Sequence, residues 1–141
     1  MIYQIKTKII NGIEYIFDYT RSKYLQNTPE EWVRQNFIIY LNQKKSYPIN
    51  LMSTEKKTKI NGLICRSDII CYNPNGNPIL IVECKSEKIN INNKTFDQLI
   101  NYQSSIQASY MVITNGKKTI CFFIKKGEII LLKKIPEYKK N

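Results

Sequence analysis

Two apolar runs separated by a turn-rich segment constrain the fold of this chain more than any other feature. The first run, residues 66–70, contains an aspartate, and the second, residues 79–85, ends in a Glu-x-Lys motif formed by Glu83 and Lys85. The intervening residues 72–78 are rich in Asn, Pro and Gly, which favour turns. The two runs are therefore predicted to form a β-hairpin.

Alternation of side chains along the two strands gathers charged groups on one face. Glu83 and Lys85 share one face of the second strand, and Arg66 and Asp68 share one face of the first. A register that brings these faces together makes two carboxylates and an ammonium group converge. Carboxylates suit Mg²⁺, which binds one or two of them together with water and substrate phosphate. A lysine beside them can orient or deprotonate an attacking water, which is the chemistry of metal-dependent phosphodiester hydrolysis.

Simpler explanations exist for the same residues. A Glu-x-Lys motif taken alone is more often part of a solvated strand face, and a buried Asp68 beside Arg66 could be an ion pair. The catalytic interpretation gains weight because the rest of the chain supplies matching elements on both sides of the hairpin.

Length and composition indicate one soluble domain. The chain has 141 residues, of which 43% are hydrophobic and 23% charged, values that are ordinary for a globular protein with a sizeable core. No apolar run approaches the length of a membrane span, and the N-terminus does not resemble a signal peptide. We therefore expect a cytoplasmic protein with no membrane partner.

The charge balance permits a polyanionic partner. The net charge is +11, which favours association with nucleic acid. However, only Arg21, Arg34 and Arg66 are arginines, and Lys, Ile and Asn are abundant, as an AT-rich genome would impose. The charge is therefore compatible with DNA binding but does not establish it.

The cysteine and histidine counts exclude several kinds of site. The chain has no histidine, which removes Ser-His and Cys-His catalysis and every histidine-based nuclease mechanism. Its cysteines lack C-x-x-C spacing, so a zinc site is disfavoured and small core residues in a reducing compartment are expected. They are Cys65, Cys71, Cys84 and Cys121.

Turn and capping signals predict the elements before the central hairpin. Two β-rich runs, residues 2–10 and 13–17, are joined by the hairpin turn Asn11-Gly12. Thr28 is predicted to cap a helix that runs to about residue 42, with Pro29 at its first position and Glu31 completing a capping box. A strand over residues 49–58 then turns at Asn61-Gly62 into the strand that carries Asp68.

A second helix is predicted after a polar loop that follows Lys85, with Thr95 as its cap. Gln98 and Tyr102 lie four residues apart on one face of this helix and could contact phosphate or steady the lysine, although two ordinary surface residues would give the same pattern. Further strands are expected at residues 110–114, 119–125 and 129–133, followed by a frayed tail at residues 136–141.

Taken together, these segments resemble a PD-(D/E)xK nuclease core. More narrowly, they resemble the N-terminal nuclease domain of type I restriction enzyme R subunits, in a form that also occurs as a small stand-alone protein. Four segments in the right order are more specific than Glu-x-Lys alone, and they span most of residues 20–125. They are TPEEWVRQ (28–35), RSDII (66–70), VECK (82–85) and FDQLINY (96–102).

The resemblance implies an α/β fold with a restriction-endonuclease-like core. In this fold, a central mixed β-sheet is flanked by helices in the order α-β-β-β-α-β, here preceded by an N-terminal β-hairpin. Residues 1–135 would form the single domain, with the hairpin at 1–19 and the core at 20–125. The tail at 136–141 would follow the domain.

The resemblance also implies roles for individual residues. Asp68 and Glu83 would bind Mg²⁺, with Mn²⁺ able to substitute, and Lys85 would be the catalytic lysine. Gln98 and Tyr102 would form the Q-x-x-x-Y pair typical of these R subunits. A supporting group would consist of Arg66 and of Glu30 or Glu31. Glu30 is favoured because it shares the apolar helix face with Val33 and Phe37, whereas the capping box already explains Glu31. Glu55 is another family position whose role is unassigned.

The leading hypothesis is a Mg²⁺-dependent DNA endonuclease or nuclease-like domain. It would recognise the DNA backbone or DNA structure, because little of the chain could read base sequence. Two alternatives remain: a non-catalytic nucleic-acid-binding or interaction module, and a nuclease subunit that is active only in a protein complex. R subunits cleave DNA within a large assembly that includes a motor, so only the nuclease core is implied for this chain.

Overall fold

The computed structural model describes most of the backbone between residues 3 and 139. Residues 61–62, 95, 98–99 and 101–106 fall outside the description, as do the side chains of residues 55–60 and 63–67. Within the described part of the chain, no helix is long and apolar enough to cross a membrane.

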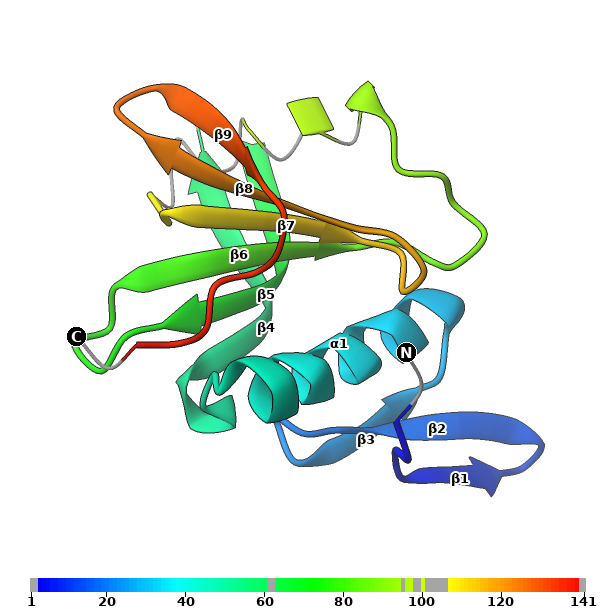
Figure 1. Cartoon of the computed structure of the whole chain (residues 1–141). Helices are drawn as coiled ribbons and strands as arrows, with labels where there is room; N and C mark the ends of the chain where they lie inside the picture. The colour runs from blue at the N-terminus through cyan, green and yellow to red at the C-terminus, as the bar shows by residue number, and fades with distance from the viewer. Residues whose placement is uncertain (1–2, 61–62, 95, 98–99, 101–106, 140–141) are drawn as a thin grey trace.

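A six-stranded mixed sheet forms the centre of the molecule, with the strands in sequence order from β4 to β9 (Figure 1). Of the strand pairs in the described residues, β6–β7 is parallel and the others are antiparallel. The strands are β4 (Met52–Ile60), β5 (Leu63–Tyr72), β6 (Pro78–Cys84), β7 (Tyr110–Thr114), β8 (Thr119–Lys125) and β9 (Glu128–Leu132). The predicted hairpin is confirmed as β5–β6.

A parallel pair of strands requires a crossover connection, and the second helix was predicted in the segment that links β6 to β7. The described residues there (93–94, 96–97 and 100) are helical. The Phe96 N–H donates to the Asn92 carbonyl at 3.2 Å, so the helix begins before residue 95 rather than at it. Thr95, Gln98 and Tyr102 lie outside the described residues.

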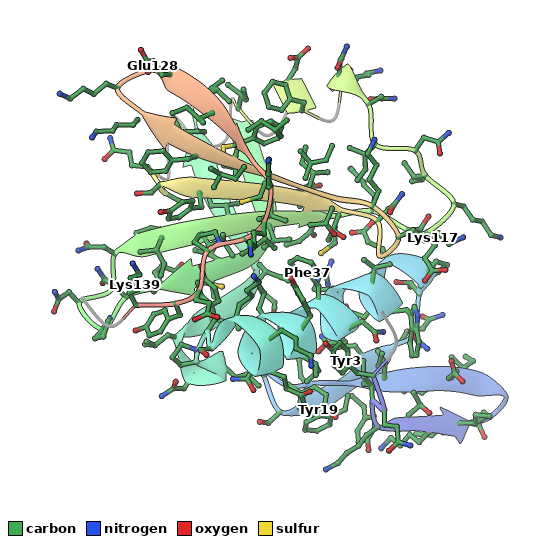
Figure 2. The ribbon with its side chains drawn as sticks, viewed as in Figure 1. Tyr3, Tyr19, Phe37, Lys117, Glu128 and Lys139 are labelled. Atoms are coloured by element: carbon green, nitrogen blue, oxygen red, sulfur yellow. The ribbon has the colours of Figure 1, made fainter. Side chains whose placement is uncertain are left out.

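Helix α1 (Pro29–Lys45) covers one face of this sheet (Figure 1). Its Thr28 cap is confirmed, because the Thr28 hydroxyl accepts a hydrogen bond from the Glu31 N–H at 3.0 Å. Phe37 lies between the helix and the sheet (Figure 2), and the buried stripe of α1 packs against apolar side chains of β5 and β6. The core on this face includes Val33, Phe37, Ile38, Leu41, Ile69, Cys71, Val82, Cys84 and Cys121. The last two and Cys71 are free thiols, as predicted for small core residues.

The opposite face of the sheet has a smaller core. Ile81 on β6 and Met111 and Ile113 on β7 are buried there, and Phe96 and Ile100 of the crossover pack against them. Because neighbouring residues of β6 point to opposite faces, Val82 belongs to the α1 core and Ile81 to this one. Both faces of the central strands are therefore covered.

The predicted N-terminal hairpin is confirmed as β1–β2, and a third strand extends it into a three-stranded sheet. Its strands are β1 (Thr7–Ile10), β2 (Ile13–Asp18) and β3 (Lys23–Gln26). The predicted turn is confirmed, because Asn11 and Gly12 have φ angles of 51° and 79°, as the hairpin turn requires. Strand β3 was missed, because its residues Lys-Tyr-Leu-Gln show no polar–apolar alternation. This small sheet lies on the side of α1 away from the large sheet (Figure 1).

Three further expectations are wrong. The capping box is incomplete, because the Thr28 N–H donates to the Gln26 carbonyl at 3.0 Å.

The tail is not frayed at residues 136–138. The Tyr138 N–H donates to the Lys45 carbonyl at 2.8 Å, and the Tyr47 hydroxyl donates to the Pro136 carbonyl at 2.9 Å. Aromatic packing between Tyr47 and Tyr138, with ring centroids 5.6 Å apart, holds this segment to the end of α1. In addition, the short 3-10 helix η1 (Ile49–Leu51) replaces the predicted start of the strand that follows α1.

Candidate active site

Asp68 lies where strands β5 and β6 begin to separate. The ladder between them starts at the Ile69–Val82 pair, and one residue further in the same register Asp68 faces Glu83. At that point the Asp68 carboxylate accepts the Cys84 backbone N–H at 2.8 Å. The side chain thus takes the position of a strand carbonyl, which fixes the carboxylate at the end of β6.

Glu83 and Lys85 bring the other two charged groups to the same place. The Lys85 Nζ atom lies 3.3 Å from Glu83 Oε1, and both side chains remain about one-fifth to one-quarter exposed. The Lys85 N–H donates to the Thr114 carbonyl at 2.8 Å, so β7 holds the backbone of this residue. The structure therefore brings Asp68, Glu83 and Lys85 together, as strand alternation predicted, while the roles assigned to them stay predictions.

Glu83 has the most perturbed carboxyl group of this site. Its pKa is raised to about 8, first by burial and then by the negative charge of Asp68, while the Lys85 ammonium acts in the opposite direction. The Glu83 carboxyl group therefore tends to hold its proton at neutral pH. A cation placed between the two carboxyl groups would relieve the same repulsion.

A pH-dependent stability is expected from Glu83 in the absence of metal. Because the folded state holds this proton more tightly than the unfolded chain does, stability should fall as pH rises from about 4.5 to about 8. Glu83→Gln should flatten that slope and melt at a higher temperature than the wild type at pH 8. Thermal melts in EDTA between pH 5 and 9 test this, with the exposed Glu128→Gln as control. Equal slopes for the wild type and Glu83→Gln would contradict it.

Arg34 of α1 belongs to the site, although the sequence reasoning did not assign it a role there. Its guanidinium donates to Asp68 Oδ1 at 3.1 Å and to Glu31 Oε1 at 2.7 Å, and its side chain is only 3% exposed. A signal for this existed, because Arg34 occupies the same helical stripe as Ile38 and Leu41. A cation on the buried face of a helix requires a buried anion opposite it.

The two glutamates at the start of α1 have different surroundings. The Glu31 side chain is 7% exposed and its second oxygen accepts from Gln35 Nε2 at 3.0 Å, so it serves to hold Arg34 and the helix. The Glu30 side chain is 40% exposed and lies 3.3 Å from Arg34. Glu31 rather than Glu30 is thus on the buried face of the helix, so the reason for preferring Glu30 does not hold, and the choice between them stays a prediction. The side chains of Arg66 and Glu55 lie outside the description.

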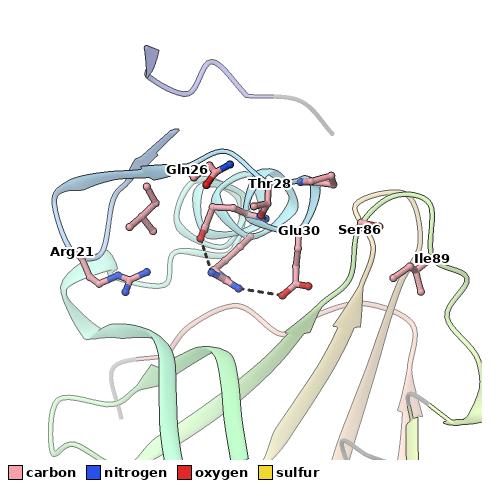
Figure 3. A pocket seen from close by; sticks show the side chains of 10 residues that line it. Arg21, Gln26, Thr28, Glu30, Ser86 and Ile89 are labelled. Atoms are coloured by element: carbon pink, nitrogen blue, oxygen red, sulfur yellow. Dashed lines mark hydrogen bonds and ion pairs between the residues drawn. The ribbon is translucent and has the colours of Figure 1, made fainter. Parts of the chain in front are cut away.

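A cleft of about 570 Å³ opens beside Glu30, Glu31 and Arg34 (Figure 3), whereas Asp68, Glu83 and Lys85 are not among the residues that line it. Its walls come from the start of α1, the turn between β2 and β3, and the loop after β6. They include Arg21, Thr28, Glu30, Arg34, Ser86 and Ile89. Dashed lines in Figure 3 mark the Arg34 bonds to Glu30 and Glu31 in the wall of the cleft.

The charges of the side chains linked between the end of β6 and the start of α1 suit a divalent cation. With every carboxyl ionised, negative charges exceed positive ones by two across Glu30, Glu31, Asp68, Glu83, Arg34 and Lys85. In the described residues, no group of three or more Asp, Glu, Cys or His side chains is arranged to enclose a metal ion. Mg²⁺ does not need such a cage, because it keeps several waters and binds through one or two carboxylates. Asp68 and Glu83 therefore fit as its protein ligands.

The topology and the site together define a restriction-endonuclease-like α/β fold. A mixed sheet carries an aspartate and a Glu-x-Lys motif at the point where two of its strands separate, and a helix covers one face. The sequence model of the family described as type I restriction enzyme R protein N terminus (HSDR_N) matches residues 29–136. The chain belongs to this family.

A solved structure agrees with this assignment at the level of the fold. The chain is similar to a fragment of the HsdR subunit assigned to a type I restriction enzyme of Vibrio vulnificus YJ016, with a TM-score of 0.61 and 18% identity. The match covers 77% of this chain and 23% of that structure, so it reaches less than a quarter of the relative. No curated protein sequence gives a significant match to the chain.

Proposed function

We propose that this protein is a Mg²⁺-dependent DNA nuclease. The observation that supports this most is the meeting of the Asp68, Glu83 and Lys85 side chains at the end of β6, linked through Arg34 to the wall of an open cleft. In the proposal, Asp68 and Glu83 hold the ion, which supplies Lewis-acid activation of water and phosphate when bound. Mn²⁺ is expected to substitute.

The remaining residues act on substrate and water. The Lys85 ammonium, held by Glu83, would orient the attacking water and offset charge on the phosphate. Arg34 keeps the Asp68 carboxylate in one orientation. Gln98 and Tyr102 are proposed to position the scissile strand, as in the Q-x-x-x-Y pair of the R subunits. Recognition would be of backbone or DNA structure rather than of base sequence.

One observation favours a second candidate, a nuclease that is active only within a protein complex. Both Asp68 oxygens already accept hydrogen bonds, one from Arg34 and one from the Cys84 N–H. A partner or DNA that moved α1 would free one oxygen for the metal. A non-catalytic module with the same fold is the third possibility. In such a module, the Arg34 guanidinium would always pair with Asp68 in place of a metal ion.

The test is a titration of Mg²⁺ and Mn²⁺ against linear duplex, single-stranded and branched DNA. Cleavage that requires the metal and disappears in Asp68→Asn is the expected result. If no substrate is cut with either metal, the complex-dependent or non-catalytic alternative replaces the proposal.

Metal binding should also stabilise the fold. An ion that binds only the folded state at 100 times its dissociation constant adds about 2.7 kcal/mol to the free energy of unfolding. We expect Mg²⁺ or Mn²⁺ to raise the melting temperature of the wild type but not that of Asp68→Asn. Melting curves unchanged by millimolar metal would argue for the non-catalytic module.

A further inference from the structure

A second cleft lies on the other side of the ridge formed by Thr28 and Pro29. It has a volume of about 390 Å³, and its walls include Trp32, Lys88 and Lys117. Thr28 and Pro29 also line the active-site cleft, so the two clefts are neighbours across the first turn of α1. Glu87 and Lys88 of this second cleft follow Lys85 by two and three residues, so a chain bound at the end of β6 could continue along this loop toward Trp32.

The loops that carry the two lysines are fixed by one buried side chain, Asn115. Its Oδ1 atom accepts the N–H groups of Lys117 and Lys118 at 3.0 and 2.7 Å, which shapes the turn between β7 and β8. Its Nδ2 atom donates to the Ile89 carbonyl at 2.8 Å, which ties this turn to the loop after β6. Lys88 and Lys117 are therefore held at the cleft by a rigid link between two loops.

The turn also packs directly on α1. Gly116 has a φ of +86°, and a Cβ atom placed there would lie 3.5 Å from Val33 Cγ2 and 3.6 Å from the Glu87 side chain. Figure 2 shows Lys117 at this turn, beside the start of the helix. Glu87 also lines the cleft and offsets one of the two lysine charges, so the cleft carries a modest positive charge rather than a strong one.

A cleft lined by an indole and two lysines has the chemistry of a site for an unpaired nucleotide. Bases of single strands stack on aromatic side chains, and lysines contact the neighbouring phosphates. Bases in a duplex are stacked inside the helix and cannot reach such a ring. The volume is at the small end of ligand sites, which suits one or two nucleotides and not a duplex groove.

We propose that the cleft of Trp32, Lys88 and Lys117 binds an unpaired nucleotide adjacent to the position of cleavage. The position of this site next to the cleaved bond rests on the proposed nuclease function. Binding of the nucleotide itself does not depend on catalysis. The proposal narrows the substrate class to single-stranded, frayed or branched DNA, in which a strand leaves the duplex near the active site.

The chain contains one tryptophan, so its fluorescence reports on the surroundings of Trp32, and the lysine variants below separate this cleft from the hollow that Trp32 lines with Tyr3 and Glu14. We would titrate the metal-free protein in EDTA with a short oligothymidylate and with a blunt duplex of equal length. Saturable quenching of Trp32 emission by the single strand, with at least tenfold weaker quenching by the duplex, is the expected result. Equal quenching by both would overturn the assignment to an unpaired strand.

Variants separate stacking from charge. With a fluorescein-labelled single strand and anisotropy as the readout, Trp32→Leu should weaken binding about 5-fold to 100-fold, since stacking on an aromatic ring is lost. Trp32→Phe keeps a ring and should stay within a few-fold of the wild type. Lys88→Ala and Lys117→Ala should each lower the salt slope of binding by about 0.7. Melting temperatures check that each variant folds.

Lys125→Ala is the matched control. Lys125 is an exposed lysine at the far end of β8, paired in register with Glu128, which Figure 2 shows at the opposite end of the sheet from Lys117. It should leave quenching and affinity unchanged. If the labelled strand binds but Trp32 is not quenched, or if Lys125→Ala weakens binding as much as Lys88→Ala, the cleft is not the site.

Cleavage of DNA by a protein that shows no quenching overturns only this inference. Quenching without cleavage of any substrate overturns only the nuclease proposal.

Discussion

Lys85→Ala is expected to lower DNA cleavage by about 100-fold to 10,000-fold, the usual contribution of a positioned acid–base group. Its ammonium lies 3.3 Å from the Glu83 carboxylate at the end of β6, where it can act on the attacking water. DNA binding should weaken only slightly, since one phosphate contact at most is lost. Cleavage rates at saturating DNA, together with affinities in EDTA, measure the two effects separately.

Asp68→Ala should give the same loss of cleavage with the opposite effect on binding. Removal of a negative charge near the phosphate should leave metal-free DNA affinity unchanged or higher. Lys125→Ala, at the distant end of β8, is the control for loss of a lysine as such and should cleave like the wild type. If the wild type cleaves and Lys85→Ala cleaves equally well, the assignment of Lys85 is wrong.

Local signals in the sequence predicted the central hairpin and its charged end. Strand alternation placed Asp68, Glu83 and Lys85 together because the β5–β6 pairing is in regular register from Ile69–Val82 to Cys71–Leu80 and the two strands are joined by strong turn formers. The turn at Asn11-Gly12 and the helix cap at Thr28 were also predictable, because each depends only on one or two residues and their own backbone. The α1–sheet core followed from the spacing of apolar residues along the helix.

Features that depend on distant partners were not predictable in the same way. Tyr138 is held by the Lys45 carbonyl and the Tyr47 ring, about ninety residues away, so the terminal segment looked free. The capping box failed because the Glu31 carboxylate is taken by Arg34, which in turn is oriented by Asp68. The Trp32 cleft arises only when the turn between β7 and β8 packs on α1.

Arg34→Met is expected to destabilise the fold by about 3–5 kcal/mol, which is the usual result of removing one partner from a buried ion pair. The guanidinium joins Glu31 of the helix to Asp68 of β5, and the side chains of all three residues are less than a tenth exposed. Methionine fills much of the volume but leaves two buried carboxylates without their cation. Urea unfolding curves measure the loss. The exposed Lys44→Met on the same helix should change stability by less than about 0.5 kcal/mol.

Arg34→Lys should recover only part of this stability. A lysine keeps the charge, but a single ammonium cannot reproduce the planar fork that donates to Glu31 and Asp68 at once. The intermediate value distinguishes a requirement for geometry from a requirement for charge. If Arg34→Lys were as stable as the wild type, the orientation of Asp68 would not depend on the fork.

A double-mutant cycle between Arg34→Met and Asp68→Asn decides whether the two residues act as a unit. Asp68→Asn removes the buried charge that Arg34 neutralises, so Arg34→Met should cost less in that background than in the wild type. Residues in one buried network typically show coupling of about 0.5–3 kcal/mol, whereas independent sites add within about 0.5 kcal/mol. Additive losses would mean that Arg34 stabilises α1 through Glu31 alone. In that case, the helix would have no role in holding the Asp68 carboxylate at the proposed metal site.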